Sequence, residues 1–447
     1  MSLGDSTVRS IAAFARARWG PQPTSRDALL QRQERTLARF LARTLPKAPF
    51  YRPYAGRPLA ALPIVDKGKI LADFAAFNTV GVTLDQALAV ALEAERSRDF
   101  RPTLKAHGEE LTVGLSSGTS GTRGVFLVSA RERARWAGLL LGRLLARESL
   151  RQILHPLQPP LRIAFFLRAN SNLYTTLGSK RIDFQFYDLW SPWEEHLQRL
   201  KAHPPDVVVA PASVLKKLTE GGEKAKGVPN LAPRQVVSVA EVLEAEDERA
   251  IVAAWGVLVQ QVYQATEGFL GASCSAGRVH LNEEEVFFEM EWLDAERRRF
   301  VPIVTDFSRT TQLVVRYRLD DVLRLAEGAC PCGRPTLSLE AIEGRADDVL
   351  EGLALDGRPV SVFPDLVRNA MSRVEGLADY RLVQDGDRWI VATPSPAVAE
   401  AVEREIGALA DRLGIRRPAV NFAPWVDLPL GEKRRRIRCL HRVEDAA

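Results

Sequence analysis

The sequence predicts an α/β protein with two domains, on three observations. The chain has 447 residues, more than one hydrophobic core of ordinary size holds. Short apolar runs alternate with helix-like segments over residues 162–263, which is typical of a parallel sheet covered by helices. The pattern becomes β-rich after Val286, and after Gly344 it indicates a small α+β module. We therefore expect a large N-terminal domain over residues 1–343, with mostly parallel sheets covered by helices and a β-rich subdomain, and a small α+β C-terminal domain over 344–447.

The first part of the chain is predicted to lead into one glycine-rich segment. Residues 1–45 have the Arg/Ala/Leu periodicity of helices, and a proline-rich stretch follows them. A helix over 84–95 precedes a short apolar strand over 111–115, which delivers the chain into the glycine-rich segment. The returning strand is expected at 126–128, and a long amphipathic helix at 131–148.

The remaining elements follow from apolar runs and their spacing. Parallel strands are expected at 162–167, 206–210, 235–239 and 257–263, with helices at 193–202, 213–220 and 244–254. The β-rich part has predicted strands at 286–292, 313–318 and 322–325. The C-terminal domain has predicted strands at 349–353, 380–383, 389–393 and 419–422, and helices at 364–373 and 397–413.

The composition excludes several classes of protein. With 46% hydrophobic and 26% charged residues, the chain is typical of globular proteins and not of disordered ones. Its net charge is +5, from 61 Lys and Arg against 56 Asp and Glu, which is too weak to indicate nucleic-acid binding. We find neither a secretory signal pattern nor an apolar run long enough to cross a bilayer, and four cysteines do not make a disulfide scaffold. We therefore expect a cytoplasmic protein without a membrane span; its oligomeric state stays open, with a homodimer as one option.

The most informative segment is rich in glycine and hydroxyl residues and follows the strand at 111–115. Glycines allow sharp turns and a close approach of backbone N–H groups, and the hydroxyls add further donors. Such a concave array of donors suits a nucleotide polyphosphate. The phosphate-loop motif of the common NTPases is absent, and a Ser/Gly-rich surface loop is the alternative. The residues are Ser116, Ser117, Gly118, Thr119, Ser120, Gly121 and Thr122, followed by Arg123 and Gly124.

Four further segments follow it in a fixed order. Tyr263-Gln264-Ala265-Thr266-Glu267 comes after a buried strand, at the end where α/β sheets bind ligands. The other three are residues 316–321 with two terminal acids, residues 344–348, and residues 430–434 with Gly-Glu-Lys. Taken singly, a Thr-Glu pair can cap a helix, and paired aspartates or Gly-Glu-Lys can be solvated turns. Their joint order is far less expected by chance.

Together these motifs make the chain resemble the adenylate-forming superfamily of acyl-CoA synthetases, carrier-protein adenylation domains and luciferases. Over roughly residues 60–440 it looks most like the branch that contains phenylacetate-CoA ligases and the related deazaflavin-adenylating synthetases. The resemblance implies that a carboxylate attacks the α-phosphate of ATP to give acyl-AMP and pyrophosphate, and that a thiol then displaces AMP. It also implies Mg²⁺ as cofactor, a small aryl or arylacetic acid as substrate, and coenzyme A or a carrier-protein phosphopantetheine as acceptor.

The resemblance carries roles over to the matching residues. The segment from Ser116 to Gly124 would hold the β- and γ-phosphates, and Glu267 would bind Mg²⁺ beside Thr266. Asp321 would accept hydrogen bonds from the ribose hydroxyls. Lys433 would reach the acid and the α-phosphate when a mobile C-terminal domain closes, with Asp347 at its hinge. The adenine end of the nucleotide would be bordered by Ala240, Glu241, Tyr263 and Gln264.

Two positions depart from the superfamily pattern, and the acid pocket is the least legible part. The glycine-rich segment usually ends Gly-Lys-Pro, whereas Arg123-Gly124 stands here and keeps a positive charge without the proline. The ribose motif usually has Gly before its final Asp, whereas Asp320 adds a negative charge here. The acid pocket is predicted on a segment that leaves a strand at its carboxyl end, and its aromatic residues could equally be core packing of the sheet. The candidate pocket residues are Phe166, Asn170 and Tyr174.

The cysteines predict a metal site. Cys274, His280, Cys330 and Cys332 stand in the pattern Cys-x₅-His … Cys-Pro-Cys-Gly. Three thiolates and an imidazole form a closed tetrahedral set for Zn²⁺, which indicates a structural ion. Some enzymes similar to phenylacetate-CoA ligases carry zinc on a comparable arrangement, and the alternative is three reduced cysteines with an unrelated histidine. Cys439 is left over and is expected to be a passive core residue.

The sequence leaves two other functions open. A close variant of the ligase would stop at adenylation and transfer AMP to a cofactor that bears a carboxylate, phosphate or hydroxyl. A catalytically silent scaffold would keep the nucleotide fold without the chemistry, and the intact Lys433, Glu267 and Asp321 argue against it. Nucleic-acid binding through the basic run at 433–436 is a third and weaker option.

Overall fold

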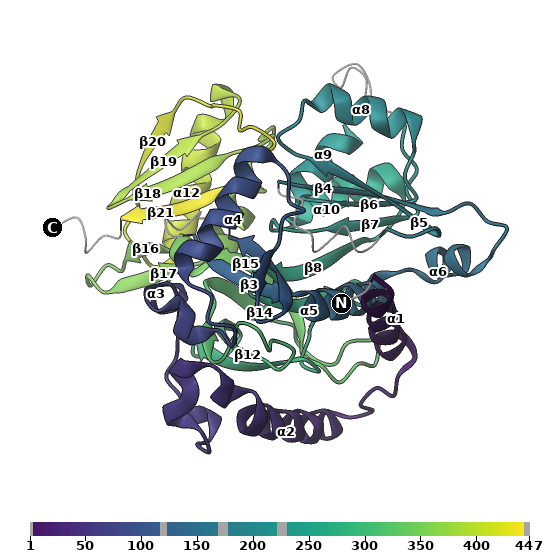
Figure 1. Ribbon diagram of the computed structural model, residues 1–447. Helices are drawn as coiled ribbons and strands as arrows, with labels where there is room; N and C mark the ends of the chain where they lie inside the picture. The colour runs from purple at the N-terminus through teal and green to yellow at the C-terminus, as the bar shows by residue number, and fades with distance from the viewer. Residues whose placement is uncertain (1–2, 117–122, 169–177, 221–229, 442–447) are drawn as a thin grey trace. The chain divides into compact units, whose positions relative to one another are not determined.

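The computed structural model of the chain describes residues 3–116, 123–168, 178–220 and 230–441 (Figure 1). The chain divides into two compact units. The first comprises Met1–Arg298, Pro302–Leu319 and Leu325–Glu340, and the second comprises Arg299–Val301, Asp320–Arg324 and Ala341–Ala447. Strands and helices alternate in both units, and the α/β class expected from the sequence is confirmed.

A five-stranded parallel sheet forms the centre of the first unit. Its order is β5-β4-β6-β7-β8, and every neighbouring pair is parallel. The strands are β4 (Leu161–Leu167), β5 (Ile182–Asp188), β6 (Val207–Ala210), β7 (Gln235–Ser238) and β8 (Val259–Ala265). Parallel neighbours need crossover connections, and three of these contain the helices α8 (Trp193–Ala202), α9 (Ala212–Thr219) and α10 (Ala245–Trp255). The predicted parallel strands are confirmed; β5 was missed because Asp183 and Gln185 interrupt its apolar pattern.

One face of the parallel sheet is covered by α5 (Ala130–Leu144) and α1 (Leu3–Trp19), and α8 and α9 lie on its other side (Figure 1). Leu139 of α5 packs in a cluster with Val237 and Val262 of the sheet. The helix predicted over 131–148 is instead two helices, α5 and α6 (Arg147–Leu154), because the backbone leaves the helical region at Leu145 with ψ 122. Nothing in the Leu/Arg pattern marks that break.

A three-stranded antiparallel sheet, in the order β1-β2-β3, precedes α5. Its strands are β1 (Leu104–Ala106), β2 (Glu109–Leu115) and β3 (Val125–Ser129). The helix before it begins at a capping box, in which Thr83 and Gln86 satisfy each other's backbone N–H groups. The elements N-terminal to this sheet, besides α1, are α2 (Arg26–Arg43), η1 (Leu45–Lys47), η2 (Pro49–Tyr54), η3 (Leu59–Ala61), α3 (Lys67–Ala72), η4 (Phe74–Phe77) and α4 (Leu84–Ser97).

Antiparallel strands extend the central sheet beyond β8, in keeping with the predicted β-rich part. The pairs β8–β9, β9–β10 and β10–β15 are all antiparallel. Of the strand predicted at 313–318, Tyr317–Arg318 pairs with β12, whereas the backbone N–H of Leu313 donates to the carbonyl of Phe77. The strands are β9 (Gly268–Ser273), β10 (Val279–Leu281), β11 (Val286–Trp292), β12 (Arg299–Asp306), β13 (Tyr317–Arg318), β14 (Asp321–Leu325) and β15 (Ser338–Arg345).

The second unit contains a four-stranded sheet in the order β20-β19-β18-β21, and helices pack on one face of it. Trp389 of the sheet, at 2% exposure, shares a core with Val402 and Ile406 of the long helix. The α+β character predicted for this part of the chain is therefore observed. Its elements are η5 (Ala346–Asp348), β16 (Leu350–Leu353), β17 (Pro359–Val362), α11 (Pro364–Met371), β18 (Arg381–Asp385), β19 (Arg388–Ala392), η6 (Pro396–Val398), α12 (Ala399–Leu413), β20 (Ala419–Ala423) and β21 (Ile437–His441).

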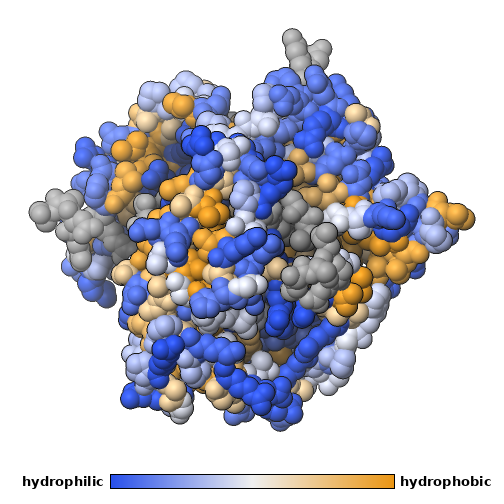
Figure 2. Space-filling view, viewed as in Figure 1, coloured by the Kyte–Doolittle hydropathy of each residue, from blue (hydrophilic) through white to orange (hydrophobic). Residues whose placement is uncertain are grey.

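Hydrophilic residues cover most of the face seen in Figure 2, and hydrophobic residues lie among them in small groups. The most exposed of the large apolar residues are Leu157 and Leu355, at 89% and 78%. Such single exposures are normal for a folded protein. Among the described helices, none has both the length and the apolar character that crossing a bilayer requires.

Candidate functional site

The two ends of the glycine-rich segment are joined to each other. Leu115 pairs with Val125, so β2 and β3 hold the segment as a connection between neighbouring antiparallel strands. The backbone N–H of Ser116 donates to the carbonyl of Gly124 at 2.8 Å, and the Gly124 N–H donates to Ser116 Oγ at 2.6 Å. These two hydrogen bonds join the first and last residues of the glycine-rich segment. The predicted phosphate-binding residues between them lie outside the described part of the chain: Ser117, Gly118, Thr119, Ser120, Gly121 and Thr122.

Arg123, which stands where the superfamily has lysine, is bound to a carboxylate of the protein itself. Its Nη1 and Nη2 donate to Glu95 of α4 at 2.7 and 2.5 Å, and its Nε donates to the carbonyl of Ser116 at 3.1 Å. The hydrogen bond from Arg123 lowers the pKa of Glu95 below its ordinary value. The Arg123 guanidinium therefore links α4 to the backbone at the start of the glycine-rich segment. Sequence reasoning had no signal for Glu95, because it lies 28 residues away on a helix surface.

Thr266 and Glu267 form the turn of a hairpin. Ala265 of β8 pairs directly with Gly268 of β9, so these two residues make the whole connection. Glu267 is 8% exposed and Tyr263, earlier on β8, is 5% exposed. A register shift between Tyr263 and Gln264 marks a bulge just before the turn.

The hairpin turn lies against the strand that leads into the glycine-rich segment. A Cβ added to Gly114 of β2 would be 3.1 Å from Cγ2 of Thr266. Gly114 stands two residues before Ser116, so two segments that the sequence predicted to share a site are adjacent. The absence of a side chain at position 114 is what permits this approach.

The segment predicted to border adenine lies at the carboxyl end of β7. Ser238 of β7 pairs with Gln261 of β8, so Ala240 and Tyr263 each stand two residues beyond a paired position on neighbouring parallel strands. Ala240 has φ 65, which non-glycine residues rarely adopt, and the Glu241 N–H donates to the Val239 carbonyl at 2.8 Å. The Glu241 carboxylate accepts from the N–H of Ser213 at 3.0 Å. The edge where α/β sheets bind ligands thus carries a strained turn.

The four predicted metal ligands lie together. Their ligand atoms are all within 4.8 Å of one another, with 3.6 Å between the sulfurs of Cys274 and Cys330 and 3.3 Å between Cys332 Sγ and His280 Nε2. A tetrahedral zinc with bonds of about 2.3 Å needs sulfurs about 3.8 Å apart, so the donor set fits the ion. The turn at Gly333, with φ 76 and its N–H on the carbonyl of Cys330 at 3.0 Å, brings the two neighbouring thiols to one side.

The orientation of His280 is determined by Thr336. Nδ1 of His280 lies 2.8 Å from Thr336 Oγ1 and 3.0 Å from its carbonyl oxygen. A proton on Nδ1 satisfies these acceptors and leaves the lone pair of Nε2 for a metal. Burial lowers the pKa of His280, which favours the neutral imidazole that metal binding requires. Thr336 was not found from the sequence, since its spacing to the cysteines carries no pattern.

Phe166 of the predicted acid pocket is a core residue. It is fully buried, stacks on Tyr187 with 4.4 Å between ring centroids, and meets the edge of His196 at 5.7 Å. This is the packing role that the sequence left as the alternative. Asn170 and Tyr174 lie outside the residues that the structure describes.

Asp321, Asp347 and Lys433 belong to the second unit. Asp321 begins β14, and Asp320 before it accepts the Ala346 N–H on its carbonyl at 2.6 Å. Asp347 is exposed in η5, whereas its neighbour Asp348 is buried and is bound by Arg435. Gly344, two residues before this short helix, has φ 117, a conformation that favours glycine.

The basic run after Lys433 is anchored inside the second unit. Arg436, with a side chain 3% exposed, donates to Asp379 at 2.6 Å and lies 5.3 Å from the ring centroid of Tyr380. Arg434 pairs with Asp379 at 3.9 Å, and Arg435 pairs with Asp348. Three guanidiniums held by carboxylates of their own unit do not form the exposed basic patch that nucleic-acid binding requires.

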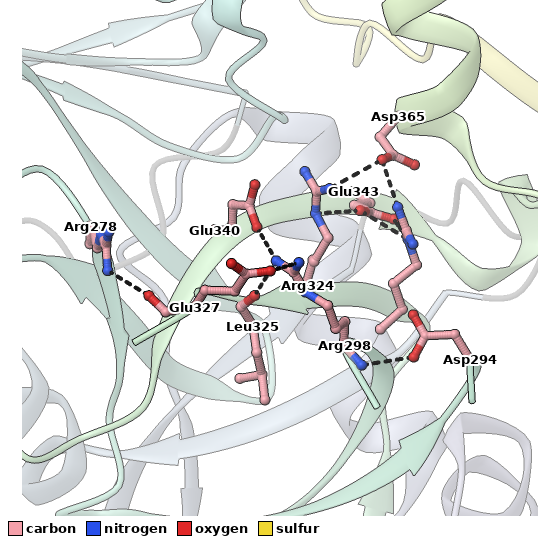
Figure 3. A network of polar contacts seen from close by, with 10 residues as sticks. Arg278, Asp294, Arg298, Arg324, Leu325, Glu327, Glu340, Glu343 and Asp365 are labelled. Atoms are coloured by element: carbon pink, nitrogen blue, oxygen red, sulfur yellow. Dashed lines mark hydrogen bonds and ion pairs between the residues drawn. The ribbon is translucent and has the colours of Figure 1, made fainter. Parts of the chain in front are cut away.

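A group of buried charges lies near the start of Ala341–Ala447, the longest segment of the second unit (Figure 3). Glu343, with a side chain 0% exposed, binds Arg299 and Arg324 at 3.0 Å each. Asp365 of α11 lies 2.8 Å from Arg299 and 3.6 Å from Arg324. Burial, reinforced by the charge of Asp365, raises the pKa of Glu343 to about 7. Sequence reasoning missed this cluster, because its members come from four separate elements.

The chain has the fold of the adenylate-forming acyl-CoA ligases. It matches 2-hydroxyisobutyryl-CoA ligase, solved in the postadenylation state with 2-HIB-AMP, with a TM-score of 0.62 at 18% identity over 95% of this chain and 91% of that one. It also matches the anthranilate-CoA ligase AuaEII with anthranoyl-AMP (0.51, 14%, 74% and 67%) and ATP-bound MatB from Rhodopseudomonas palustris (0.50, 15%, 73% and 65%). At these identities the likeness establishes the fold. No protein-family model and no curated protein sequence matches the chain.

Proposed function

We propose that the chain is an ATP- and Mg²⁺-dependent acid–thiol ligase. A carboxylic acid, of the aryl or arylacetic class, becomes acyl-AMP with release of pyrophosphate, and the acyl group then passes to coenzyme A or a carrier-protein phosphopantetheine. The observation that carries this proposal is the contact of Thr266 with Gly114, since it joins the Thr-Glu turn to the entrance of the Ser/Gly segment. The fold shared with acyl-CoA ligases supports it.

The first step needs charge neutralisation and alignment more than covalent help from the protein. An oxygen of the substrate carboxylate attacks the α-phosphorus, and the bond to the β-phosphate oxygen breaks as pyrophosphate leaves. N–H and hydroxyl groups from Ser116 to Gly124 would hold the β- and γ-phosphates, and Lys433 would offset the charge that develops at the α-phosphate. Mg²⁺, bound through Glu267 beside Thr266, would supply further neutralisation of the triphosphate.

The nucleoside would lie along the carboxyl edge of the sheet. The Ala240–Glu241 turn and Tyr263 with Gln264 would border adenine, and Asp321 would accept from both ribose hydroxyls. In the second step the sulfur of the thiol attacks the acyl carbonyl and AMP departs as the C–O bond breaks, with the thiol proton released. The superfamily changes the face presented to the adenylate by rotating its C-terminal domain, and Asp347 matches its hinge.

The test is pyrophosphate exchange into ATP with a panel of aryl, arylacetic and fatty acids. We expect exchange with at least one acid, and a loss of about 100-fold in Lys433→Ala. Arg438→Ala is the matched control, because Arg438 is an exposed cation of the same unit, on β21, and should leave the rate unchanged. Exchange that survives Lys433→Ala would contradict the role of the lysine.

The acceptor is tested in the same preparation. For a ligase, steady-state release of AMP should require added coenzyme A or carrier protein. Steady-state release of pyrophosphate without any thiol, with the AMP recovered on a cofactor and not as free AMP, would favour the variant that transfers AMP to a cofactor. A folded protein that exchanges with no acid would favour the silent scaffold.

We also propose a structural Zn²⁺ held by Cys274, His280, Cys330 and Cys332. The support is the grouping of their four ligand atoms and the hydrogen bond that sets His280. Four protein ligands fill a tetrahedral site, so the ion would stabilise the fold and would not act on substrate. The zinc site agrees with the phenylacetate-CoA ligase-like branch within the superfamily.

A further inference from the structure

A mostly buried polar segment that no predicted motif includes contacts the candidate site. It begins at Asp306, the last residue of β12, and ends at Gln312. Asp306 is 2% exposed, and Arg309 and Gln312 are both 0% exposed. Burying such side chains is costly unless each finds partners. Their partners therefore indicate what the segment holds in place.

The first partner is β3, the strand that returns from the glycine-rich segment. Gln312 Oε1 accepts the N–H of Leu127 at 2.7 Å, and Arg309 Nη2 donates to the Leu127 carbonyl at 3.0 Å. Gln312 Nε2 also donates to the carbonyl of Val125, at 3.4 Å. Because β3 is the edge strand of its sheet, these side chains satisfy the backbone groups that a further strand would otherwise pair. The strand that follows the glycine-rich segment is therefore attached to the polar segment by these side chains.

The second partner is the start of α5. The buried Glu132 accepts the N–H groups of Thr310 and Thr311 on Oε1, at 2.6 and 3.0 Å. Its Oε2 accepts the N–H of Ser129 at 2.8 Å, which is the last residue of β3. The polar segment, β3 and α5 are therefore one rigid hydrogen-bonded group.

The third partner is the Thr266–Glu267 turn. Asp306 Oδ1 accepts the N–H and the hydroxyl of Ser308 at 2.7 and 2.6 Å, which fixes the carboxylate. Its Oδ2 then lies so close to Gly268 that a Cβ added there would be 2.8 Å away. Gly268 directly follows Glu267, so the Asp306 carboxylate contacts the backbone at the end of the turn.

We propose that Asp306 is a positioning residue for Glu267: its carboxylate, held by Ser308, supports the backbone of the turn at Gly268 while Arg309 and Gln312 hold β3. The turn and the end of the glycine-rich segment then keep one mutual geometry. This inference rests on the proposed function, since it assigns to Asp306 the alignment of the residues that would bind MgATP. Displacing a binding group by about 1 Å can lower a rate by about 100-fold.

The free-energy cost of burying the Asp306 carboxylate supports a role for this residue beyond stability. Burial raises the pKa of Asp306 to about 6, against the opposing hydrogen bonds from Ser308 and the charge of Arg309. At neutral pH the buried group is mainly ionised, and its desolvation weakens the fold. An amide of the same shape would remove that cost and would still accept from Ser308.

The test compares Asp306→Ala and Asp306→Asn with wild type in pyrophosphate exchange and in unfolding by denaturant. In Asp306→Ala, which removes the support at Gly268, we expect kcat/KM for MgATP to fall at least about tenfold and the half-saturating Mg²⁺ concentration to rise. Asp306→Asn keeps the shape and the bonds to Ser308, so it should retain near wild-type exchange, with unfolding stability unchanged or higher. Asp247→Asn is the matched control: Asp247 is a fully buried carboxylate of the same unit that pairs with Lys216 at 3.1 Å, outside this group. It should lose stability and keep the wild-type KM for MgATP.

A second arm uses the glycine. Gly268→Ala should reduce exchange strongly in wild type, but less when Asp306→Ala has removed the carboxylate that the new methyl meets. Exchange by Asp306→Ala at the wild-type kcat and KM, or strictly additive effects of the two alanines, would overturn the inference while the proposed function stands. Wild-type protein without exchange for any acid would overturn the proposed function, and the assignment of Asp306 would fall with it.

Discussion

The side chain of Thr266 lies against the backbone of Gly114, with 3.1 Å between Cγ2 and the place where a Cβ would stand at position 114. The two residues come from different sheets, β2 on one side and the hairpin of β8 and β9 on the other. A methyl group at Gly114 therefore has to displace either the turn or the strand that carries Ser116. The contact makes the geometry of the two motifs interdependent.

Gly114→Val should uncouple these motifs. The branched side chain overlaps Thr266, so we expect a loss of about 1–3 kcal/mol in unfolding free energy and a larger fractional loss of pyrophosphate exchange. Gly68→Ala is the control, because its Cβ would meet nothing closer than the flexible Asp66 carboxylate at 3.4 Å. If Gly114→Val retained wild-type exchange, the contact would have no part in the reaction.

Removal of the metal should destabilise the first unit. We expect purified protein to contain about one zinc per chain by elemental analysis, because the four ligands complete one tetrahedral site. Cys330→Ser should lower both the zinc content and the midpoint of thermal unfolding, whereas Cys439→Ser, whose thiol lies near Gln384 in the other unit, should change neither. A zinc-free preparation with unaltered thermal stability would refute the site.

Stability should decline as the buried Glu343 ionises. Its folded pKa of about 7 is above the ordinary value of 4.5, because burial and then Asp365 disfavour the charge. The contribution of the protonated form is complete below pH 4.5 and is lost as the pH rises through 7. From pH 6 to pH 8 we expect wild type to lose about 1 kcal/mol relative to Glu343→Gln, measured by urea unfolding of the full chain. Parallel pH profiles for the two proteins would contradict the raised pKa.

The contact of α1 with α5 should depend on two glycines. A Cβ at Gly138 would be 2.2 Å from the Ser10 carbonyl oxygen, and one at Gly142 would be 2.9 Å from the Phe14 carbonyl oxygen. Gly138→Ala should therefore lower the unfolding free energy by about 1–3 kcal/mol and expose α1 to limited proteolysis. Gly407→Ala is the control on a helix of the second unit, where the nearest atom is the flexible Arg417 side chain at 3.5 Å. Equal protease resistance of both variants would show that the close approach does not hold α1.

Repetitive patterns made much of the fold predictable. The runs of Val in β6 and β7 could be read as buried parallel strands because neighbouring apolar residues point to both faces. The helix break at Leu145 could not, because the residues on both sides of it keep helical periodicity. Of the strand predicted at 313–318, the apolar Leu313 to Val315 are fully buried, but Leu313 bonds to Phe77 and only Tyr317–Arg318 forms a strand.

The candidate site was predictable where spacing carries the chemistry. Cys274 and Cys330 could be grouped because ligand spacing is itself the constraint on a tetrahedral ion. Glu95, Asp306 and Gln312 could not be found, since each is a common polar residue whose importance depends on a partner far away in the sequence. Their burial or pairing exists only after the sheets have formed, and a local pattern cannot encode it.

The turn between β8 and β9 does not tolerate an inserted residue. It is two residues long, and one inserted residue would move every side chain of β9 to the opposite face. Glu267 precedes that strand and Cys274 comes directly after its last residue, so the same insertion would move a proposed zinc ligand away from the other three. We therefore expect relatives of this chain to keep the length of this connection and to differ from it in other segments.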